Sequence, residues 1–302
     1  MYDIIVIGGG VAGLMAALYA RRASKTVLVI EKETFGGQIT FSPKVENIPG
    51  FNQISGNEYA EKLVEQVLNQ GADVESALVT KITDGKEFKT VITDAGEFTS
   101  KAVIIATGAR HRTLGLEGEA ELIGEGISFC AVCDGAFYSG QTVAVIGGGN
   151  SALQEALLLS DLVEKLYVIQ DLEYLTGEAK LAEQLKEREN VEIICGAKVE
   201  KYLTSDNGIA GVGISLSDGT SREIKADGVF LAVGLIPQNE PFSDIIALDE
   251  RGYGASGEDC KTKTEGVFIA GDCRQKSVRQ VTTAAADGAV AALAACRYID
   301  NA

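Results

Sequence analysis

The stretch Ile4-Ile5-Val6-Ile7-Gly8-Gly9-Gly10-Val11-Ala12-Gly13 decides the fold expected for this chain. A short apolar run that predicts a buried strand leads into a glycine-rich turn, and residues 14–23 follow with the small side chains of a closely packed helix. A second apolar run at 26–30 ends at Glu31. Strand, G-x-G-x-x-G turn, helix and second strand together form the unit that holds the pyrophosphate of a dinucleotide.

Each position of this turn has a separate expected role. Gly8 makes the tight turn, Gly10 lets the backbone approach a pyrophosphate, and Gly13 permits close packing of helix on strand. The helix N-terminus adds free N–H groups and the positive end of its dipole. Glu31, with Lys32 beside it, stands where a carboxylate accepts ribose hydroxyls. The alternative interpretation is a glycine-rich turn without a ligand.

A second opening of the same kind begins about 140 residues later, with a strand at 143–146, a helix at 153–160 and a strand at 165–169. Its turn has the pattern G-x-G-x-x-A, which the dinucleotide fingerprint tolerates. The candidate nucleotide-binding residues of this turn are Gly147, Gly149, Asn150, Ser151 and Ala152. The alternative is a relic fold that no longer binds a nucleotide.

The residues after the strand at 165–169 bear on which dinucleotide would bind. A site selective for NADPH usually offers arginines here to meet the 2′-phosphate. This chain has Gln170 at the ribose-reading position and Asp171 beside it. A carboxylate would repel a 2′-phosphate and could accept a hydrogen bond from a free 2′-hydroxyl, so the sequence does not support a preference for NADPH.

Three further strand-to-turn segments suggest that one domain is split by the other. The strand expected at 97–105 ends in Ala106-Thr107-Gly108, and a similar strand at 225–233 also returns the chain across a domain border. The run at 266–270 leads into Gly271-Asp272, which would place a carboxylate beside the hydroxyls of a cofactor, although a helix-capping aspartate is the alternative. A long alanine-rich helix is expected at 281–297.

The stretch Cys130-Ala131-Val132-Cys133-Asp134 carries the chemistry. Two residues between cysteines allow a readily reversible disulfide, which a bound flavin can reduce by supplying two electrons. A thiol formed in this way attacks a partner disulfide, and Asp134 could pass a proton to the departing thiolate. The alternative is a pair of buried free cysteines. The other four cysteines are expected to be small core or surface residues.

Composition limits the possible partners and surroundings. The 302 residues carry a formal charge of −16, which disfavours nucleic acid and anionic membranes as partners, and their number predicts two domains. Six cysteines are too sparse for a disulfide scaffold, and a single histidine makes zinc improbable. No apolar run is long enough to span a membrane, and the first strand begins too early for a signal peptide. We therefore expect a cytoplasmic protein without a metal.

Over essentially its whole length the chain resembles the low-molecular-weight thioredoxin reductases, which are flavoprotein disulfide reductases of bacteria. The resemblance implies an α/β fold with two Rossmann-like domains, the second inserted into the first. The FAD-binding domain would comprise 1–112 and 244–302, and the pyridine-nucleotide-like domain with the cysteine pair would comprise 113–243. The motifs that carry the resemblance are Gly8–Gly13, Gly36-Gly37-Gln38, Val45–Gly50, Ala106-Thr107-Gly108, Cys130–Gly135, Gly147–Ala152, Gly271-Asp272 and Arg279-Gln280-Val281.

The resemblance also implies roles for these residues. The first glycine turn would hold the FAD pyrophosphate and Glu31 the ribose, Cys133 would face the flavin, and Cys130 would attack the disulfide of thioredoxin with Asp134 as the acid. Family members are homodimers whose inserted domain swings, with hinges near 112–116 and 240–246. The residues expected around the rest of FAD are Gly37, Gln38, Asn47, Thr107, Gly108, Gly271, Asp272, Arg279, Gln280 and Val281.

One departure from the family pattern concerns the electron donor. Relatives that use NADPH carry a His-Arg-Arg run and a further arginine where this chain has Gln170-Asp171-Leu172 and Tyr174. We rank NADH first as the donor, NADPH second and reduced ferredoxin third, because the second glycine turn is intact. The alternative to a thioredoxin-reducing enzyme is a flavin and thiol module that senses redox state without turnover.

Overall fold

The computed structural model describes residues 1–42, 45–85, 87–205 and 208–301. The chain forms two compact units, Met1–Arg110 with Ile236–Ala302, and His111–Leu235. The sequence analysis placed the border at which the chain returns to the first domain after residue 243, whereas the second compact unit ends at Leu235 and the first resumes at Ile236. The physical reason is burial, because Phe242, Ile245 and Ile246 lie in the apolar core of the first unit.

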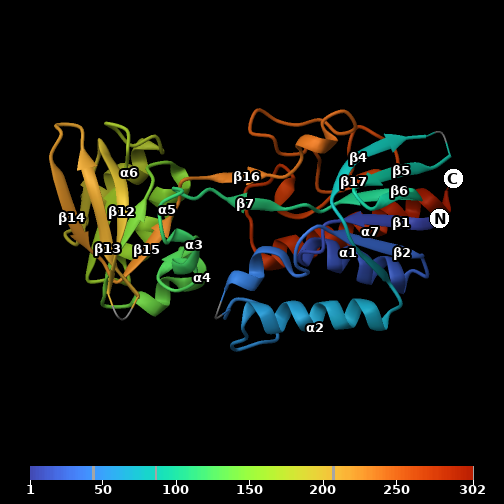
Figure 1. Ribbon diagram of the computed structural model, residues 1–302, viewed down its shortest axis with the longest axis horizontal. Helices are drawn as coiled ribbons and strands as arrows, with labels where there is room; N and C mark the ends of the chain where they lie inside the picture. Colours follow the sequence, from blue (N-terminus) through green and yellow to red (C-terminus); the bar gives the residue numbers. More distant parts are fainter. Residues whose placement is uncertain (43–44, 86, 206–207, 302) are drawn as a thin grey trace. The chain divides into compact units, whose positions relative to one another are not determined.

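The first unit contains a seven-stranded sheet with the order β3-β2-β1-β6-β5-β4, and β17 pairs with β6 outside this path (Figure 1). The strands β3, β2, β1, β6 and β17 run parallel to one another, whereas β5 pairs antiparallel with both β6 and β4. Their bounds are β1 Tyr2–Ile7, β2 Val27–Glu31, β3 Asp73–Ser76, β4 Val79–Asp84, β5 Lys89–Thr93, β6 Gly96–Ile105 and β17 Val267–Ile269.

Helices α1 (Val11–Arg22) and α7 (Val281–Asp300) pack tightly against each other in this unit. A Cβ atom at Gly288 would overlap the carbonyl oxygen of Ala12, so the helices touch through their backbones. This close approach explains why both helices are rich in alanine and glycine. The unit also contains helix α2 (Gly56–Asn69) and the short 3-10 helices η1 (Gly37–Phe41), η3 (Glu240–Phe242) and η4 (Gly271–Cys273).

The second unit has a five-stranded parallel sheet with the order β11-β10-β9-β15-β8 and a three-stranded antiparallel sheet with the order β12-β13-β14. The strands are β8 Ile127–Ser128, β9 Thr142–Ile146, β10 Lys165–Ile169, β11 Val191–Ile194, β12 Ala197–Ser205, β13 Gly208–Leu216, β14 Ser221–Lys225 and β15 Gly228–Leu231. The helices are α3 Glu119–Leu122, α4 Ala131–Asp134, η2 Gly135–Tyr138, α5 Asn150–Ser160 and α6 Ala179–Lys186.

The α/β fold class with two parallel-sheet units confirms the sequence prediction, but several element ends differ. Helices α1 and α5 begin inside their glycine turns, earlier than expected, because the last residue of each motif belongs to the first helical turn. The strand expected at 225–233 is only Gly228–Leu231, since Lys225 belongs to β14. Where the chain passes between the units, β7 (Ala109–His111) pairs with β16 (Leu235–Pro237).

Candidate active site

The first glycine turn has the packing that a dinucleotide turn requires. Gly8 has φ of +106°, and a Cβ atom there would overlap the carbonyl oxygen of Ala106. A Cβ atom at Gly13 would overlap the carbonyl oxygen of Gly8, so the helix lies directly on the turn. At Gly10 the nearest atom outside the chain neighbours would be 3.8 Å from the Cβ, so protein packing does not demand glycine. Close approach of a pyrophosphate would demand it.

The second glycine turn repeats this arrangement. Gly147 has φ of +128°, and a Cβ atom there would crowd the carbonyl oxygen of Ala232. Gly149 resembles Gly10, with its nearest neighbour, the Thr176 hydroxyl oxygen, at 3.8 Å from a Cβ. Ala152 takes the place of Gly13 and is fully buried. Both turns therefore keep a bare backbone at the middle glycine of the fingerprint.

Glu31 is held beside the first turn by backbone donors. Its Oε2 accepts from the Gly9 N–H at 2.7 Å and its Oε1 from the Glu33 N–H at 2.8 Å. Each oxygen keeps a further acceptor site, which suits ribose hydroxyls. Lys32 is exposed and pairs with Glu33 at 3.2 Å. The described structure therefore supports a cofactor role for Glu31 and shows no contact from Lys32 to the turn.

At the equivalent place in the second unit, Gln170 is buried and packs over Gly148, because a Cβ atom at Gly148 would be 2.7 Å from its Cδ. Asp171 is exposed. Asn150 is bonded to the following loop, since its Oδ1 accepts from the Glu178 N–H at 2.6 Å and its Nδ2 donates to the Glu178 carboxylate at 3.2 Å. The rim of this turn is thus acidic, and Ser151 lies exposed beside it.

Segments far apart in the sequence meet near the first turn. Gly36 bridges to Gly10, and a Cβ atom at Gly37 would be 3.2 Å from the Gly10 Cα, which places Gln38 close by in η1. Asn47 donates from Nδ2 to the Gln280 carboxamide at 3.3 Å. Val281 begins α7 and packs on the small apolar cluster of Val45, Ile48 and Ile54. The structure therefore brings the expected flavin-side residues of the first unit together.

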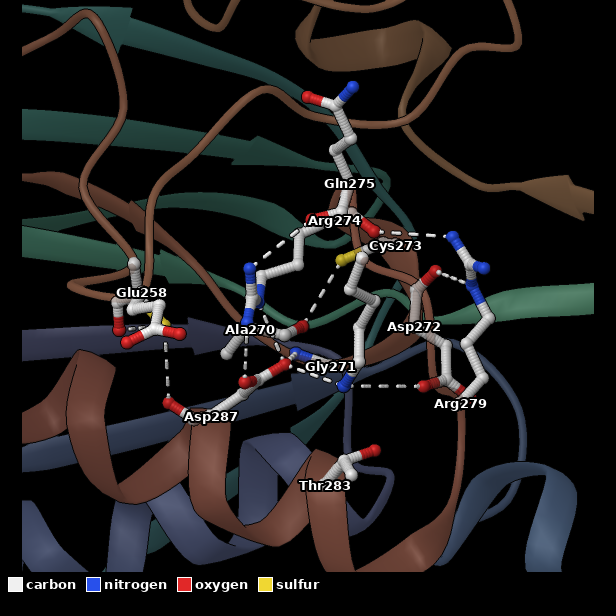
Figure 2. A network of polar contacts seen from close by, with 12 residues as sticks. Glu258, Ala270, Gly271, Asp272, Cys273, Arg274, Gln275, Arg279, Thr283 and Asp287 are labelled. Carbon is white, nitrogen blue, oxygen red and sulfur yellow. Dashed lines mark hydrogen bonds and ion pairs between the residues drawn. The ribbon is translucent and has the colours of Figure 1, made fainter.

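Asp272 has an unsatisfied buried oxygen. Its Oδ1 has no hydrogen bond, and burial raises the pKa of the carboxyl although Lys276 and Arg279 oppose that shift. Arg279 donates from Nε to the Asp272 carbonyl at 3.2 Å (Figure 2). Its guanidinium also lies over the Tyr253 ring. A buried acceptor of this kind is normally paired, and a hydroxyl group can donate to it. The first unit therefore fits a cofactor that carries hydroxyls and a pyrophosphate.

Asn239 was missed in the sequence. It is fully buried and donates from Nδ2 to the carbonyls of Gly252 at 3.0 Å and Cys273 at 2.6 Å. Its Oδ1 accepts from the Thr107 hydroxyl at 3.4 Å, so it connects the turn at Thr107-Gly108 to the one at Gly271–Cys273. An asparagine shortly after Pro237 resembles an ordinary turn residue, and the sequence offers no further signal.

Cys130 and Cys133 form a disulfide at the start of the short helix α4, with their Cα atoms 5.3 Å apart. The Cys130 sulfur accepts from the Cys133 N–H at 3.2 Å. The same contact would stabilise a Cys130 thiolate after reduction. Cys195, Cys260, Cys273 and Cys296 are free, and the last three are buried, as expected for core residues.

Asp134 lies next to this disulfide and is positioned by Ser128. The Ser128 hydroxyl donates to the Asp134 Oδ2 at 2.6 Å and accepts from the Cys130 N–H at 3.1 Å. The Asp134 Oδ1 is buried without a hydrogen bond, and burial raises the pKa of the carboxyl although the Ser128 bond lowers it. A carboxyl whose pKa is raised in this way keeps its proton to higher pH than an exposed aspartate, so beside a disulfide it can serve as an acid. The sequence identified Asp134 but not the bridging role of Ser128.

His111, the single histidine of the sequence, stands next to the hinge expected near 112–116. It stacks on Phe129 with ring centroids 4.4 Å apart, and burial lowers the pKa of its imidazole to about 4. It is therefore neutral at physiological pH, and its ring packs against the residue that precedes Cys130. The hinge prediction stays a prediction.

Glu155, in α5, is a buried acid outside this site. Its Oε2 has no hydrogen bond, and burial raises the pKa of its carboxyl from 4.5 to about 8. The folded chain then holds a proton that the unfolded chain releases, so this group lowers stability as pH rises from about 4.5 to about 8. We expect Glu155→Gln to stabilise by on the order of 3 kcal/mol above that range and little below it.

Thermal unfolding of both forms across this pH range measures the effect. Exposed Glu189→Gln is the control and should change nothing at either extreme. If Glu155→Gln raised the free energy of unfolding equally at the lowest and the highest pH, the raised pKa of Glu155 would be contradicted.

Among the described residues, no group of three His, Cys, Asp or Glu side chains is placed to hold a metal ion. In the same ranges, none of the helices is long and apolar enough to cross a membrane.

Known proteins resemble this chain over essentially its whole length. The family profile "Pyridine nucleotide-disulphide oxidoreductase" matches residues 2–288. The thioredoxin reductase of Bacillus subtilis is 39% identical over all of this chain and 96% of the relative. A "34.2 kDa protein in rubredoxin operon" of Clostridium pasteurianum is also 39% identical, over 98% of this chain and 97% of that protein.

A solved structure shows the same similarity in three dimensions. Thioredoxin reductase from Streptococcus pyogenes superposes with a TM-score of 0.95 at 36% identity, covering 100% of this chain and 99% of that one. Two dinucleotide turns, a reversible cysteine pair and full-length similarity agree with one another. The chain therefore belongs to the pyridine nucleotide-disulphide oxidoreductase family, within its group of low-molecular-weight thioredoxin reductases.

Proposed function

We propose that the chain reduces the disulfide of thioredoxin, or of a thioredoxin-like protein, with electrons from a reduced nicotinamide dinucleotide. The observation that carries this proposal is the Cys130–Cys133 disulfide with the acid Asp134 held beside it by Ser128. The name of the Bacillus subtilis relative, a thioredoxin reductase at 39% identity, supports the same partner. When bound, FAD supplies the two-electron transfer that connects donor and disulfide.

In the first unit, different residues would bind the pyrophosphate and the hydroxyl groups of FAD. The turn Gly8–Gly13 and the N-terminus of α1 would bind its pyrophosphate, and Glu31 would accept its ribose hydroxyls. The free Oδ1 of Asp272 would accept a further hydroxyl. Asn47 and Gln280, which bond to each other, would close the site from the start of α7.

In the second unit, the cysteine pair would transfer the electrons to the partner. Once bound FAD has supplied two electrons to open the Cys130–Cys133 disulfide, the Cys130 thiolate would attack one sulfur of the thioredoxin disulfide. The other thioredoxin sulfur would leave as a thiolate that takes a proton from Asp134. Cys133 then attacks Cys130, which releases the second thioredoxin sulfur and restores the Cys130–Cys133 disulfide. The Cys133 N–H keeps Cys130 reactive by stabilising its thiolate.

We also propose NADH as the preferred donor, because no arginine or lysine follows β10 before Lys180 and Asp171 stands exposed beside Gln170. We expect kcat/KM to be higher with NADH than with NADPH. Asp171→Arg should raise the ratio of NADPH to NADH use by about tenfold or more, because it replaces repulsion of the 2′-phosphate with attraction. Glu189→Arg makes the same charge change at an exposed site away from this turn and should leave the ratio unchanged.

Steady-state assays with oxidised thioredoxin and NADH, NADPH or reduced ferredoxin test both parts of the proposal. Strong use of NADPH by the unchanged chain would contradict the repulsion argument, and activity only with reduced ferredoxin would replace the nicotinamide donor. No turnover with any donor would contradict the enzyme assignment and leave the redox-sensing alternative. The homodimer implied by the resemblance is a separate proposal, which sedimentation tests.

A further inference from the structure

Asp287 is a buried carboxylate that neither the glycine turns nor the cysteine pair uses. It lies on α7, where all residues between Val281 and Arg297 other than Asp287 are uncharged, and it is 7% exposed. We propose that Asp287 is a positioning residue for the flavin cofactor, because it fixes the turn that carries Asp272 and keeps Lys276 from donating a hydrogen bond to Asp272. This inference rests on the proposed function in one respect, namely that FAD binds in the first unit.

A hydrogen bond from the backbone of Gly271 joins Asp287 to the turn that carries Asp272. Asp287 Oδ2 accepts from the Gly271 N–H at 3.1 Å (Figure 2). Gly271 has φ of +78°, and a Cβ atom there would be 2.7 Å from the Cβ of Ala12, so α1 confines the turn on its other side. Asp272 is the next residue. The direction in which its carboxylate points therefore depends on a turn held between α1 and Asp287.

Two cations, Arg274 and Lys276, surround the Asp287 carboxylate. Arg274 donates to both oxygens of Asp287 at 2.9 Å, and Lys276 donates to Oδ2 at 2.9 Å. The side chains of Arg274 and Lys276 are only 12% and 8% exposed. Burial alone would raise the pKa of Asp287, but the bonds from Arg274 and Lys276 outweigh it and keep the pKa below its ordinary value. Asp287 is therefore charged and fully engaged.

Lys276 lies between two carboxylates, those of Asp287 and Asp272. Its Nζ is 2.9 Å from the Asp287 Oδ2 but 4.0 Å from the Asp272 Oδ1, and these are its carboxylate partners within the described residues. The Asp272 Oδ1 consequently lacks a hydrogen-bond donor. If Asp287 lost its charge, Lys276 would move to Asp272, because a nearly buried ammonium needs a partner. That move would occupy the oxygen that a cofactor hydroxyl requires.

The test measures the Kd for FAD binding to the apoprotein, and the quenching of flavin fluorescence reports the binding. Asp287→Asn keeps the shape and one acceptor oxygen but removes the charge. We expect the Kd for FAD to rise by about tenfold or more. Adding Lys276→Met to Asp287→Asn should restore the Kd to within about threefold of the unchanged protein, because the competing ammonium is gone. A role of Asp287 in folding alone would not produce this rescue. Asp300→Asn, near the end of the same helix, is the matched control and should leave the Kd unchanged.

Two outcomes would overturn the inference while leaving the proposed function intact. One is an Asp287→Asn protein that binds FAD as tightly as the unchanged chain, and the other is a double variant that stays as weak as Asp287→Asn. If Asp287→Asn does not fold, Lys276→Met alone decides, since it should bind FAD within about threefold of the unchanged protein and a tenfold loss would make Lys276 a direct contributor. Absence of FAD binding by the unchanged apoprotein would instead refute the proposed function and this inference with it.

Discussion

Replacing Cys130 by Ser is expected to reduce thioredoxin turnover by at least about a thousandfold while FAD remains bound. Serine cannot form the disulfide with Cys133, and its hydroxyl does not attack a disulfide at neutral pH. The loss measured in steady state should be the same with every donor, because the pair lies after the donor step. The flavin spectrum should be retained, because the residues proposed to bind FAD lie in the other compact unit.

The two cysteines should then differ in a covalent test. A single-cysteine thioredoxin, supplied as a mixed disulfide with a chromogenic aromatic thiol, should transfer its protein thiol to Cys130 in Cys133→Ser and release the coloured thiol. Cys130→Ser should form much less adduct. Cys195→Ser, which changes a partly exposed free cysteine, is the control and should behave as the unchanged protein. Adduct formation on Cys133 alone would reverse the assigned roles, and turnover by Cys130→Ser would refute them.

Asp134→Asn is expected to lower kcat by about a hundredfold or more, because it removes the acid beside the disulfide. The asparagine keeps the shape, and its carbonyl can still accept from the Ser128 hydroxyl, so the geometry around Cys130 should survive. Burial raises the pKa of Asp134, so its protonated form persists to higher pH than an exposed aspartate would allow. In the unchanged protein, protonation of the leaving thiolate should slow as pH rises through that raised pKa.

The measurement is the pH dependence of single-turnover reduction of thioredoxin. Asp134→Asn should be slow throughout and should lack the alkaline decline assigned to this carboxyl. Ser128→Ala should lower the single-turnover rate by about tenfold or less, because the Asp134 carboxyl remains but loses the hydrogen bond that orients it. Asp161→Asn, at an exposed site of the same unit, is the control. A rate for Asp134→Asn close to that of the unchanged chain would assign the proton to another group.

The sequence predicts the parts of this protein that depend on local pattern. Apolar runs and glycine spacing were enough to predict both strand–turn–helix units and the position of Glu31 beside the first turn, because each is set within one βαβ unit. The Cys130–Cys133 pair was predictable because its two-residue spacing is itself a local pattern. The inserted order of the units came from the resemblance, and the second border lies earlier than expected because the burial of Phe242 has no local signature.

The contacts that complete the site could not be predicted because they join distant residues. Asn239 bridges Thr107 and Cys273, which no spacing rule connects. Ser128 reaches Asp134 only because α4 turns the chain back on itself. Asp287 did leave one usable signal, a single carboxylate within an alanine-rich helix, since an isolated buried charge needs partners. Its partners Arg274 and Lys276 become apparent only once α7 lies beside the turn at Gly271.

The contact between Gly288 of α7 and Ala12 of α1 also has a consequence for biosynthesis. Helix α1, which follows the first glycine turn, leaves the ribosome before the residues of the second unit, and α7, which covers it, leaves after them. The residues of the second unit are synthesised in between and are complete before α7 exists. The second unit can therefore fold during translation, whereas the first can be completed only after α7 has been synthesised.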